Sequence, residues 1–432
     1  MASRLLWRRS ATAAGIYGST ALGILGAVVV LRVLGPTDAG RFSLAVGMAA
    51  FFQLLLELTS DEALVKFGFR YAAQENWGRF HRLVRLTFSW ELGASLLAGG
   101  IVAILAPFAD SLFHSHGLQT PTLIAAFLPP LQAVESMGAA ALILRSRYDI
   151  RAGFQSFSMG LRLVAILVGT QIGVTETVVA VVAAQVVTTA SIVGAGLAAL
   201  RRFPAAAPEP LAGDRRTVLS FVLQSSIGTG LVSLRGWIAP LALGIVRNPT
   251  DVGLFRGAQA PLLGFASLSA PVRLILLTEQ TRDWEHGRPA VVFAGLRRYV
   301  IGTTLLMAVA LAPLEVAMPS LVRLVLGHKY VPAIDAARIV LGAAAIQLIL
   351  GWTKSFPVTI GRPGLRIVAH GVETVVLLPL LIAFGKLWGV SGAAVAVLVS
   401  TGAFAAVWAV LVVRLRRSPF PGRPGPVEVT AT

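Results

Sequence analysis

The sequence predicts an all-α, polytopic membrane protein with twelve transmembrane helices in two six-helix lobes related by a parallel pseudo-twofold repeat. Two observations predict this fold class. Hydrophobic residues make up 56% of the 432-residue chain and charged residues only 13%, which is too little charge to cover a soluble protein of this size. The segments 35–42 and 248–255 both contain Pro-Thr-Asp-x-Gly-x-Phe, 213 residues apart. A half-length repeat in a membrane protein is typical of transporters built from two related bundles.

Apolar runs of about 20 residues, the length that crosses a hydrocarbon core, predict the individual helices. They cover 12–34, 42–60, 86–107, 122–144, 154–173, 176–200, 222–246, 254–277, 299–320, 335–353, 366–386 and 390–413. The first run lacks a small-residue cleavage site at its end, so we expect a retained helix and not a signal peptide.

Charge and composition predict how the helices are grouped and oriented. Most of the 37 Lys and Arg residues lie at the two termini and on alternate loops, so the positive-inside rule places both termini in the cytoplasm. The Ala-, Pro- and Gly-rich stretch 204–216 has no apolar period and separates a predicted lobe 1–203 from a second lobe 217–417. Because each lobe has six helices, an even number, both lobes start on the same side of the membrane, which makes the repeat parallel. Residues 418–432 are predicted to be a disordered cytoplasmic tail.

Two further features of the composition exclude other classes of protein. The chain has no cysteine and its six histidines lack helical ligand spacing, so no disulfide and no metal site are predicted. A net charge of +17 would suggest nucleic acid in a soluble protein. Here the basic residues fall between apolar runs, where they face an anionic lipid leaflet, and no basic-aromatic groove is present. We therefore expect no nucleic-acid partner.

Four segments resemble polysaccharide transporters of the multidrug/oligosaccharidyl-lipid/polysaccharide (MOP) exporter superfamily, the Wzx-type O-antigen flippases. Leu34–Phe42 is similar to the family's Leu-Gly-Pro-x-x-Tyr-Gly-x-Phe signature, although Ala39 stands where the family usually has Tyr. Leu326–Ala333 is similar to its Phe-Gly-x-x-Tyr-x-x-Ala loop. Gly361–Arg366 and Gly389–Ala394 resemble the segments that enter its last two helices. The resemblance implies a MATE-like fold around a central cavity that opens alternately to each side.

The resemblance also implies a function. It points to a flippase of the bacterial inner membrane that moves an undecaprenyl-pyrophosphate-linked oligosaccharide to the outer leaflet for lipopolysaccharide or other surface polysaccharide assembly. Its partners would be that substrate and membrane lipid, with a proton or sodium gradient as the energy source. Other polysaccharide assembly proteins are further candidate partners, and no cofactor is implied. A cation-coupled multidrug exporter of the same superfamily is the alternative.

A membrane glycosyltransferase or polymerase would need a catalytic domain, and the predicted outer loops 108–121 and 321–334 are too short for one, so no enzyme and no catalytic residue are predicted.

Arginines are the candidates for binding the phosphates of such a substrate. The 213-residue offset maps Arg235 onto Leu22, the middle of the first helix, and a charge at that depth usually faces a cavity or bundle interior. A guanidinium can donate two hydrogen bonds to one phosphate group. An internal ion pair or a snorkelling side chain is the alternative. By family resemblance the first, second, seventh and eighth helices line the cavity, so Arg273, Arg32 and Arg256 are further candidates. Arg32 and Arg256 lie near the outer membrane interface, where an arginine is common without a binding role.

Carboxylates are the candidates for energy coupling. Glu57, in the inner half of the second helix, and Asp61, one turn further on, could bind and release a proton as the cavity alternates. The alternative is that Glu57 neutralises Arg235 or Arg273. Glu91, Glu315 and Glu373, nearer helix ends or on peripheral helices, are secondary candidates. Arg162 and Glu135 lie mid-helix on consecutive antiparallel helices, and we expect them to form a structural pair.

Overall fold

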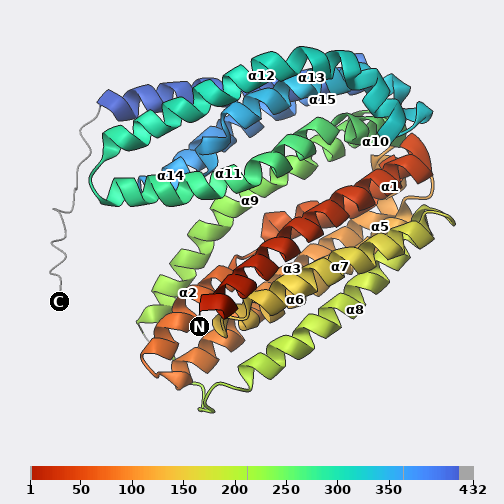
Figure 1. Cartoon of the computed structure of the whole chain (residues 1–432). Coiled ribbons are helices and arrows are strands. Elements are labelled where there is room, and N and C mark those ends of the chain that lie inside the picture. Colours follow the sequence, from red (N-terminus) through yellow and green to blue (C-terminus); the bar gives the residue numbers. More distant parts are fainter. Residues whose placement is uncertain (1, 212, 363, 418–432) are drawn as a thin grey trace. The chain divides into compact units, whose positions relative to one another are not determined.

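The computed structural model describes residues 2–211, 213–362 and 364–417, in which every regular element is a helix (Figure 1). It describes only the backbone of residues 2–13, 227–229, 231–235, 267–278, 285, 358 and 416–417. The predicted tail 418–432 lies outside the described residues.

The chain divides into two compact units, Met1–Gly253 and Leu254–Thr432. The first unit contains α1 (Ala2–Leu56), α2 (Ser60–Ala73), α3 (Trp77–Leu105), η1 (Ala106–Phe108), α4 (Ala109–Leu112), α5 (Gln119–Ala125), α6 (Leu128–Leu144), α7 (Tyr148–Gly169), α8 (Val174–Leu200), α9 (Asp214–Val246) and the start of α10 (Pro249–Ala258). The second contains α11 (Ala260–Glu285), α12 (Pro289–Val325), η2 (His328–Ala333), α13 (Ile334–Ile349), η3 (Gly351–Lys354), α14 (Phe356–Thr359) and α15 (Gly364–Arg417).

Two pairs of predicted helices are each joined into one kinked element. In α1 the kink is at Gly35, with φ 75° and ψ 176°, and in α15 it is at Gly389, with φ 59° and ψ −130°. Both glycines have positive φ, which a residue with a side chain rarely adopts. Pro36 follows the first kink and starts the next helical segment, where its missing N–H costs nothing. The joined elements therefore keep the predicted boundaries between spans at the glycines.

Within the described residues, eight helices are long and apolar enough to cross a membrane. Gly364–Leu415 contains two predicted spans, and Ala14–Leu56 covers most of two. The predicted span 42–60 was too long, because residues 57–59 are not helical. The predicted spans 222–246 and 254–277 include side chains outside the described set. The twelve-span count is compatible with this and stays a prediction.

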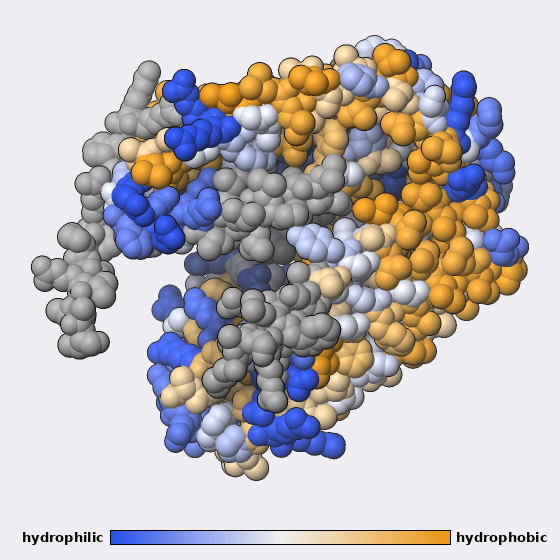
Figure 2. Space-filling view, in the orientation of Figure 1, coloured by the Kyte–Doolittle hydropathy of each residue, from blue (hydrophilic) through white to orange (hydrophobic). Residues whose placement is uncertain are grey.

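Large apolar side chains lie on the outside of the helices, as lipid-facing surfaces require. Val316 is 79% exposed, and Val309 and Ile104 are similarly open. Figure 2 shows hydrophobic residues along the helices and hydrophilic residues gathered toward helix ends. The solvent of these middle segments is therefore lipid.

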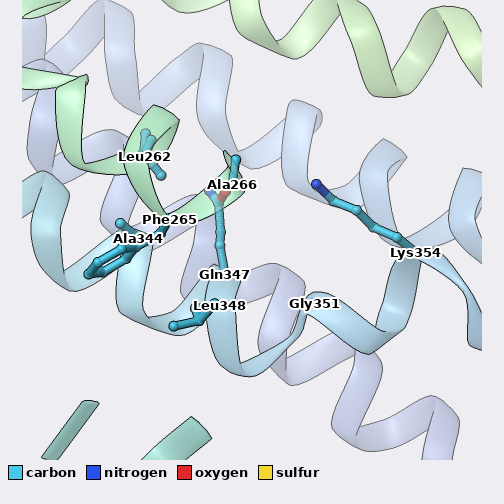
Figure 3. Close-up of a pocket in the computed structure, with 8 residues that line it drawn as sticks. All are labelled: Leu262, Phe265, Ala266, Ala344, Gln347, Leu348, Gly351 and Lys354. Carbon is cyan, nitrogen blue, oxygen red and sulfur yellow. The ribbon is translucent and has the colours of Figure 1, made fainter. Parts of the chain in front are cut away.

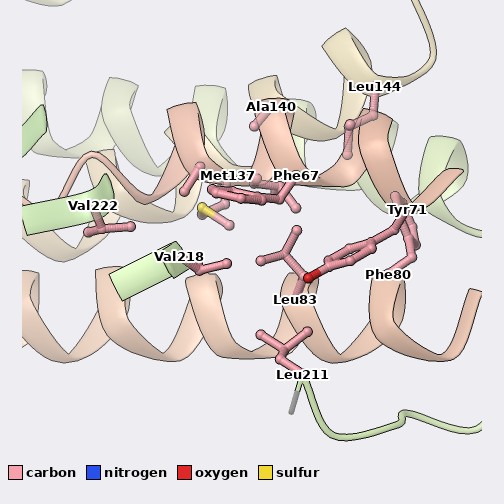
Figure 4. Close-up of a cluster of buried hydrophobic side chains, with 12 residues drawn as sticks. Phe67, Tyr71, Phe80, Leu83, Met137, Ala140, Leu144, Leu211, Val218 and Val222 are labelled. Atoms are coloured by element: carbon pink, nitrogen blue, oxygen red, sulfur yellow. The ribbon is translucent and has the colours of Figure 1, made fainter. Parts of the chain in front are cut away.

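The segment between α8 and α9 is anchored on the first unit. Leu211 is 4% exposed and belongs to a buried cluster with Phe67, Tyr71 and Phe80 (Figure 4). Burial and the hydrogen bond that Tyr71 donates to Asp214 (3.0 Å) raise the pKa of Tyr71 to about 12. The compact units thus divide at Gly253, because α9 packs with the first unit. The predicted lobe boundary at 204–216 follows the sequence repeat, and it stays a prediction.

Candidate functional site

The second half of α1 and the helix α9 pack antiparallel, from Leu44 beside Gly244 to Leu54 beside Gly230. A Cβ atom at Gly244 would lie 2.5 Å from Leu44, and one at Gly47 would lie 2.8 Å from the ring of Trp237. Further along, a Cβ atom at Gly230 would lie 3.3 Å from the carbonyl oxygen of Leu54. Glycines let two membrane helices approach this closely. We call this contact the α1–α9 seam.

At one end of the seam, which we call the motif end (residues 36–40 and 249–253), the two copies of the repeated motif contact each other. The Thr37 and Thr250 hydroxyl oxygens are 2.9 Å apart. A Cβ atom at Gly40 would overlap the carbonyl oxygen of Pro249, and one at Gly253 would overlap the carbonyl oxygen of Pro36. Each motif glycine therefore packs against the proline of the other copy, and a side chain cannot replace either glycine without a shift of backbone.

The aspartates of the two motifs are held locally. Asp38 pairs with Arg41 (3.0 Å), and Asp251 pairs with Arg247 (2.8 Å). The backbone N–H of Asp251 also donates to the Asn248 side chain (3.0 Å). These contacts fix the first turn of each helical segment and leave the threonines and glycines to form the contact between copies.

At the other end, which we call the break end (residues 57–62 with 225–226), the helix is interrupted. The chain from Glu57 to Thr59 is not helical. Ser226 of α9 accepts a hydrogen bond from the backbone N–H of Thr59 (2.9 Å), and Ser225 donates to the carboxylate of Glu62. Interrupted helices leave backbone groups without intrahelical partners, and transporters commonly use such breaks as ion and substrate sites. Two serines of α9 thus hold the end of the unwound segment and the first turn of α2.

Carboxylates gather around the break end. Glu57, predicted to lie within the second helix, lies in the unwound segment instead, and Asp61 lies in the first turn of α2. The two carboxylates interact electrostatically. Glu91 of α3 interacts with both. Arg151 of α7 interacts with Asp61. The two predicted coupling residues therefore lie near each other. Glu91, a secondary candidate in the sequence analysis, belongs to the same group of carboxylates. Their coupling role stays a prediction.

The predicted phosphate-binding arginines are distributed over both units. Arg235 lies in α9 between Gly230 and Trp237, and Arg273 lies in α11, but the side chains of both are outside the described set. Arg32 is exposed near the kink of α1, and Arg256 in α10 is half-buried. Binding of phosphate by these four residues stays a prediction.

The predicted pair of Arg162 and Glu135 belongs to a small polar network inside the first unit. Arg162 of α7 interacts electrostatically with Glu135 of α6. Gln185 of α8 donates to the Glu135 carboxylate and lies 3.1 Å from the Thr189 hydroxyl. Gln185 is only 8% exposed. Sequence spacing did not single out Gln185, because its partners lie on other helices. Whether the network is only structural stays a prediction.

A small pocket lies in the second unit between α11, α13 and η3 (Figure 3). The polar side chains in its lining are Gln347 and Lys354, and the rest is mostly apolar. None of the predicted site residues lines it. Among the described residues, no group of three or more His, Asp or Glu side chains is arranged to hold a metal ion.

Comparison with solved structures identifies the class of fold. An inward-facing multidrug resistance MATE family transporter of the MOP superfamily aligns with a TM-score of 0.71 at 14% identity, covering 93% of this chain and 96% of the other. The lipid II flippase MurJ in an inward closed conformation aligns with a TM-score of 0.71 at 12% identity, covering 94% and 88%. A MOP superfamily transporter from Pyrococcus furiosus aligns with a TM-score of 0.57 at 15% identity, covering 95% of each chain. The predicted MATE-like, all-helical fold is confirmed.

The family follows from the sequence comparison. Residues 9–272 match the family model described as polysaccharide biosynthesis protein. The chain therefore belongs to the polysaccharide biosynthesis protein family, within a MOP-type transporter fold. A comparison with curated proteins finds no match.

Proposed function

We propose that this protein is a Wzx-type flippase that moves an undecaprenyl-pyrophosphate-linked oligosaccharide across the bacterial inner membrane by alternating access. The observation that carries the proposal is the match of residues 9–272 to the polysaccharide biosynthesis family on a chain whose fold is shared with a lipid II flippase. Polysaccharide precursors are carried on lipid phosphates, so a membrane transporter of this family needs to bind phosphate. Arg235, Arg273, Arg32 and Arg256 are the proposed phosphate-binding residues.

The seam supports the alternating-access part of the proposal. With both termini in the cytoplasm, the motif end lies at the outer face and the break end at the inner face. The motif end is closed by backbone contacts that a passing head group would have to separate. The break end is held by two serine contacts, which are easily exchanged for water. Coupling by protons at Glu57 and Asp61 is the proposed energy source.

A cation-coupled multidrug exporter is the second candidate, because a MATE family transporter aligns as well as the lipid II flippase does. The carboxylates at the break end would suit a cationic drug. The two candidates predict different substrates for the same conformational cycle.

The test is the sidedness of lipid-linked oligosaccharide in cells that lack the protein. We expect the intermediates to accumulate facing the cytoplasm and to be cleared by the wild-type protein. Arg235→Ala should translocate about ten- to hundredfold less, since a charged hydrogen-bonding pair contributes about 1.5–3 kcal/mol. Arg323→Ala, which removes an exposed Arg at the end of α12, is the matched control and should clear them. An unchanged pool and sidedness in the deletion strain would reject the flippase, and a deletion strain that instead retains added cationic drugs would favour the exporter.

A further inference from the structure

The pocket of the second unit lies at a break in a membrane helix. α13 ends at Ile349, and the chain continues through the short helices η3 and α14. Tyr299 of α12 donates a hydrogen bond to the carbonyl oxygen of Leu348 (2.8 Å), and a Cβ atom at Gly351 would lie 2.6 Å from the same tyrosine oxygen. Transporters commonly place binding sites at such breaks. Tyr299 therefore holds the break in place beside the pocket.

Two helices give the pocket an apolar wall (Figure 3). Side chains at i, i+3 and i+4 lie on one face of a helix. With this spacing α11 contributes Leu262, Phe265 and Ala266, and α13 contributes Ala344 and Leu348. The empty volume, counted to the open mouth of the pocket, is about 290 Å³, which is no more than the smallest sites that enclose a drug-sized ligand. The pocket can therefore take only one part of a large lipid-linked ligand.

The polar end of the pocket carries one positive charge and one amide group. Gln347 lies on the same face of α13 as Ala344, and Lys354 is the last residue of η3. Figure 3 shows the Lys354 side chain reaching from η3 back toward Gln347. None of the described residues in the lining is acidic. Because an ammonium group and an amide group both donate hydrogen bonds, and the first is charged, the polar end favours an anion such as phosphate.

The apolar wall narrows the anion to a phosphate that is bonded directly to a hydrocarbon chain. An isoprenyl phosphate joins its chain to a phosphate oxygen with no group between them. A glycerophospholipid instead has a glycerol and two ester groups at that place, and Gln347 is the only polar side chain besides Lys354 in the described lining. A cationic drug would meet the like charge of Lys354. An isoprenyl phosphate therefore fits the lining better than either.

We propose that this pocket binds the chain-proximal phosphate and the first isoprene units of a polyprenyl phosphate carrier. Lys354 and Gln347 bind the phosphate, and Phe265 packs against the chain. The choice of a polyprenyl carrier rests on the proposed function, which requires a lipid-linked precursor. The positive-inside orientation places η3 toward the inner face, where the precursor is taken up. The candidate Arg273 lies about two turns further along α11 than Ala266.

The charge is tested with farnesyl phosphate, a short isoprenyl phosphate, titrated calorimetrically into the purified full-length protein in a neutral detergent. We expect Lys354→Gln to weaken binding about tenfold or more, because hydrogen bonds to charged groups are the strong ones. Lys354→Arg keeps the charge and should bind within a few-fold of the wild type. Lys386→Gln removes an exposed lysine of α15 in the same unit. It is the matched control and should leave binding unchanged.

The apolar wall is tested by filling it. Ala344→Leu leaves Lys354 in place but occupies the space for the chain, and it should abolish binding of farnesyl phosphate. Ala383→Leu, at an exposed alanine of α15, is the control and should bind normally. Ala344 is 1% exposed, so if its variant does not fold, Leu262→Gln replaces it. Leu262 is only half-buried, and a polar group there should weaken binding several-fold.

Four results would overturn the proposal. They are equal binding by Lys354→Gln and wild type, farnesol binding as tightly as farnesyl phosphate, unchanged binding in both wall variants, and a short-chain phosphatidylglycerol binding as tightly with the same dependence on Lys354. The last would assign the pocket to a phospholipid. Binding of dodecyltrimethylammonium in place of farnesyl phosphate would also overturn it and would favour the exporter.

These measurements use no oligosaccharide, so they are separate from the sidedness test. If farnesyl phosphate binds as expected while the sidedness test fails, the proposed function is rejected and the pocket stands as an isoprenyl phosphate site. If the sidedness test succeeds and farnesyl phosphate does not bind, the flippase stands and the assignment of this pocket is overturned.

Discussion

At the motif end of the α1–α9 seam backbone meets backbone, whereas at the break end hydroxyl and carboxyl side chains meet an unwound chain. The motif end is made by Gly40 and Gly253 against proline carbonyl groups, with one threonine pair beside them. The break end is made by Ser225 and Ser226 against Glu62 and Thr59. The seam therefore ends in a contact of α1 with α10 that depends on shape and in a contact of the α1–α2 break with α9 that depends on polar chemistry.

This difference shows how the two ends of one seam can respond to two signals. A contact between glycines and carbonyl oxygens contains no titratable group, so it opens only when the helices are pushed apart. A contact of hydroxyl and carboxyl groups changes strength with protonation and with access to water. We expect the motif end to respond to steric changes and the break end to respond to pH.

The largest effect is expected from a side chain at the motif end. Gly40→Leu should prevent the contact, because its Cβ atom alone overlaps the Pro249 carbonyl oxygen, and overpacking of this kind costs about 1–3 kcal/mol or more. Cross-linking of the Thr37→Cys and Thr250→Cys pair should be lost, and transport with it. Gly100→Leu, at a glycine of α3 with open space around it, is the matched control. Full cross-linking in Gly40→Leu would show that the motif end is not held by glycine packing.

A smaller effect is expected from the serines of the break end. Ser226→Ala removes the acceptor for the Thr59 N–H and should weaken docking by about 1 kcal/mol, the usual net value of one hydrogen bond. The measurement is the melting temperature of the purified protein. Ser191→Ala, whose hydroxyl bonds only within its own helix, controls for the loss of a helical hydroxyl. Equal melting temperatures for Ser226→Ala and wild type would mean that this hydrogen bond does not hold α9.

The smallest effect is expected from the threonine pair. Thr37→Val and Thr250→Val each remove one hydroxyl group of a hydrogen bond between exposed residues. The double mutant should lose less than the sum of the single losses, with a coupling of about 0.5–1 kcal/mol. Thermal unfolding of the four proteins in the cycle measures it. Strict additivity would show that the threonines meet without stabilising each other, and that glycine packing alone closes the motif end.

Local rules made much of the architecture predictable. Hydropathy indicated the membrane helices, and the all-helical, MATE-like fold is confirmed. The boundary between the first two helices lies at Gly35, because Gly-Pro combines a residue that tolerates positive φ with one that starts a helix. Each of these features depends on a few neighbouring residues, so a sequence pattern contains enough information to predict it.

The contents of the site depended on residues far apart in the chain. The repeat predicted that the two motifs are related by symmetry, but their mutual contact through Gly40 and Gly253 comes from packing across 213 residues. Glu57 and Asp61 could be chosen from the sequence, whereas their electrostatic interaction with Glu91 follows from how α3 packs on α2.

By itself, then, the sequence determined the membrane class, the helical segments, the boundaries between spans at Gly35 and Gly389 and the resemblance to polysaccharide transporters. The tertiary structure decided which glycines touch, where α1 unwinds and which carboxyl groups gather beside the break. The physical reason is range: hydropathy and backbone sterics act between neighbours along the chain, whereas burial and electrostatics are set by neighbours in space.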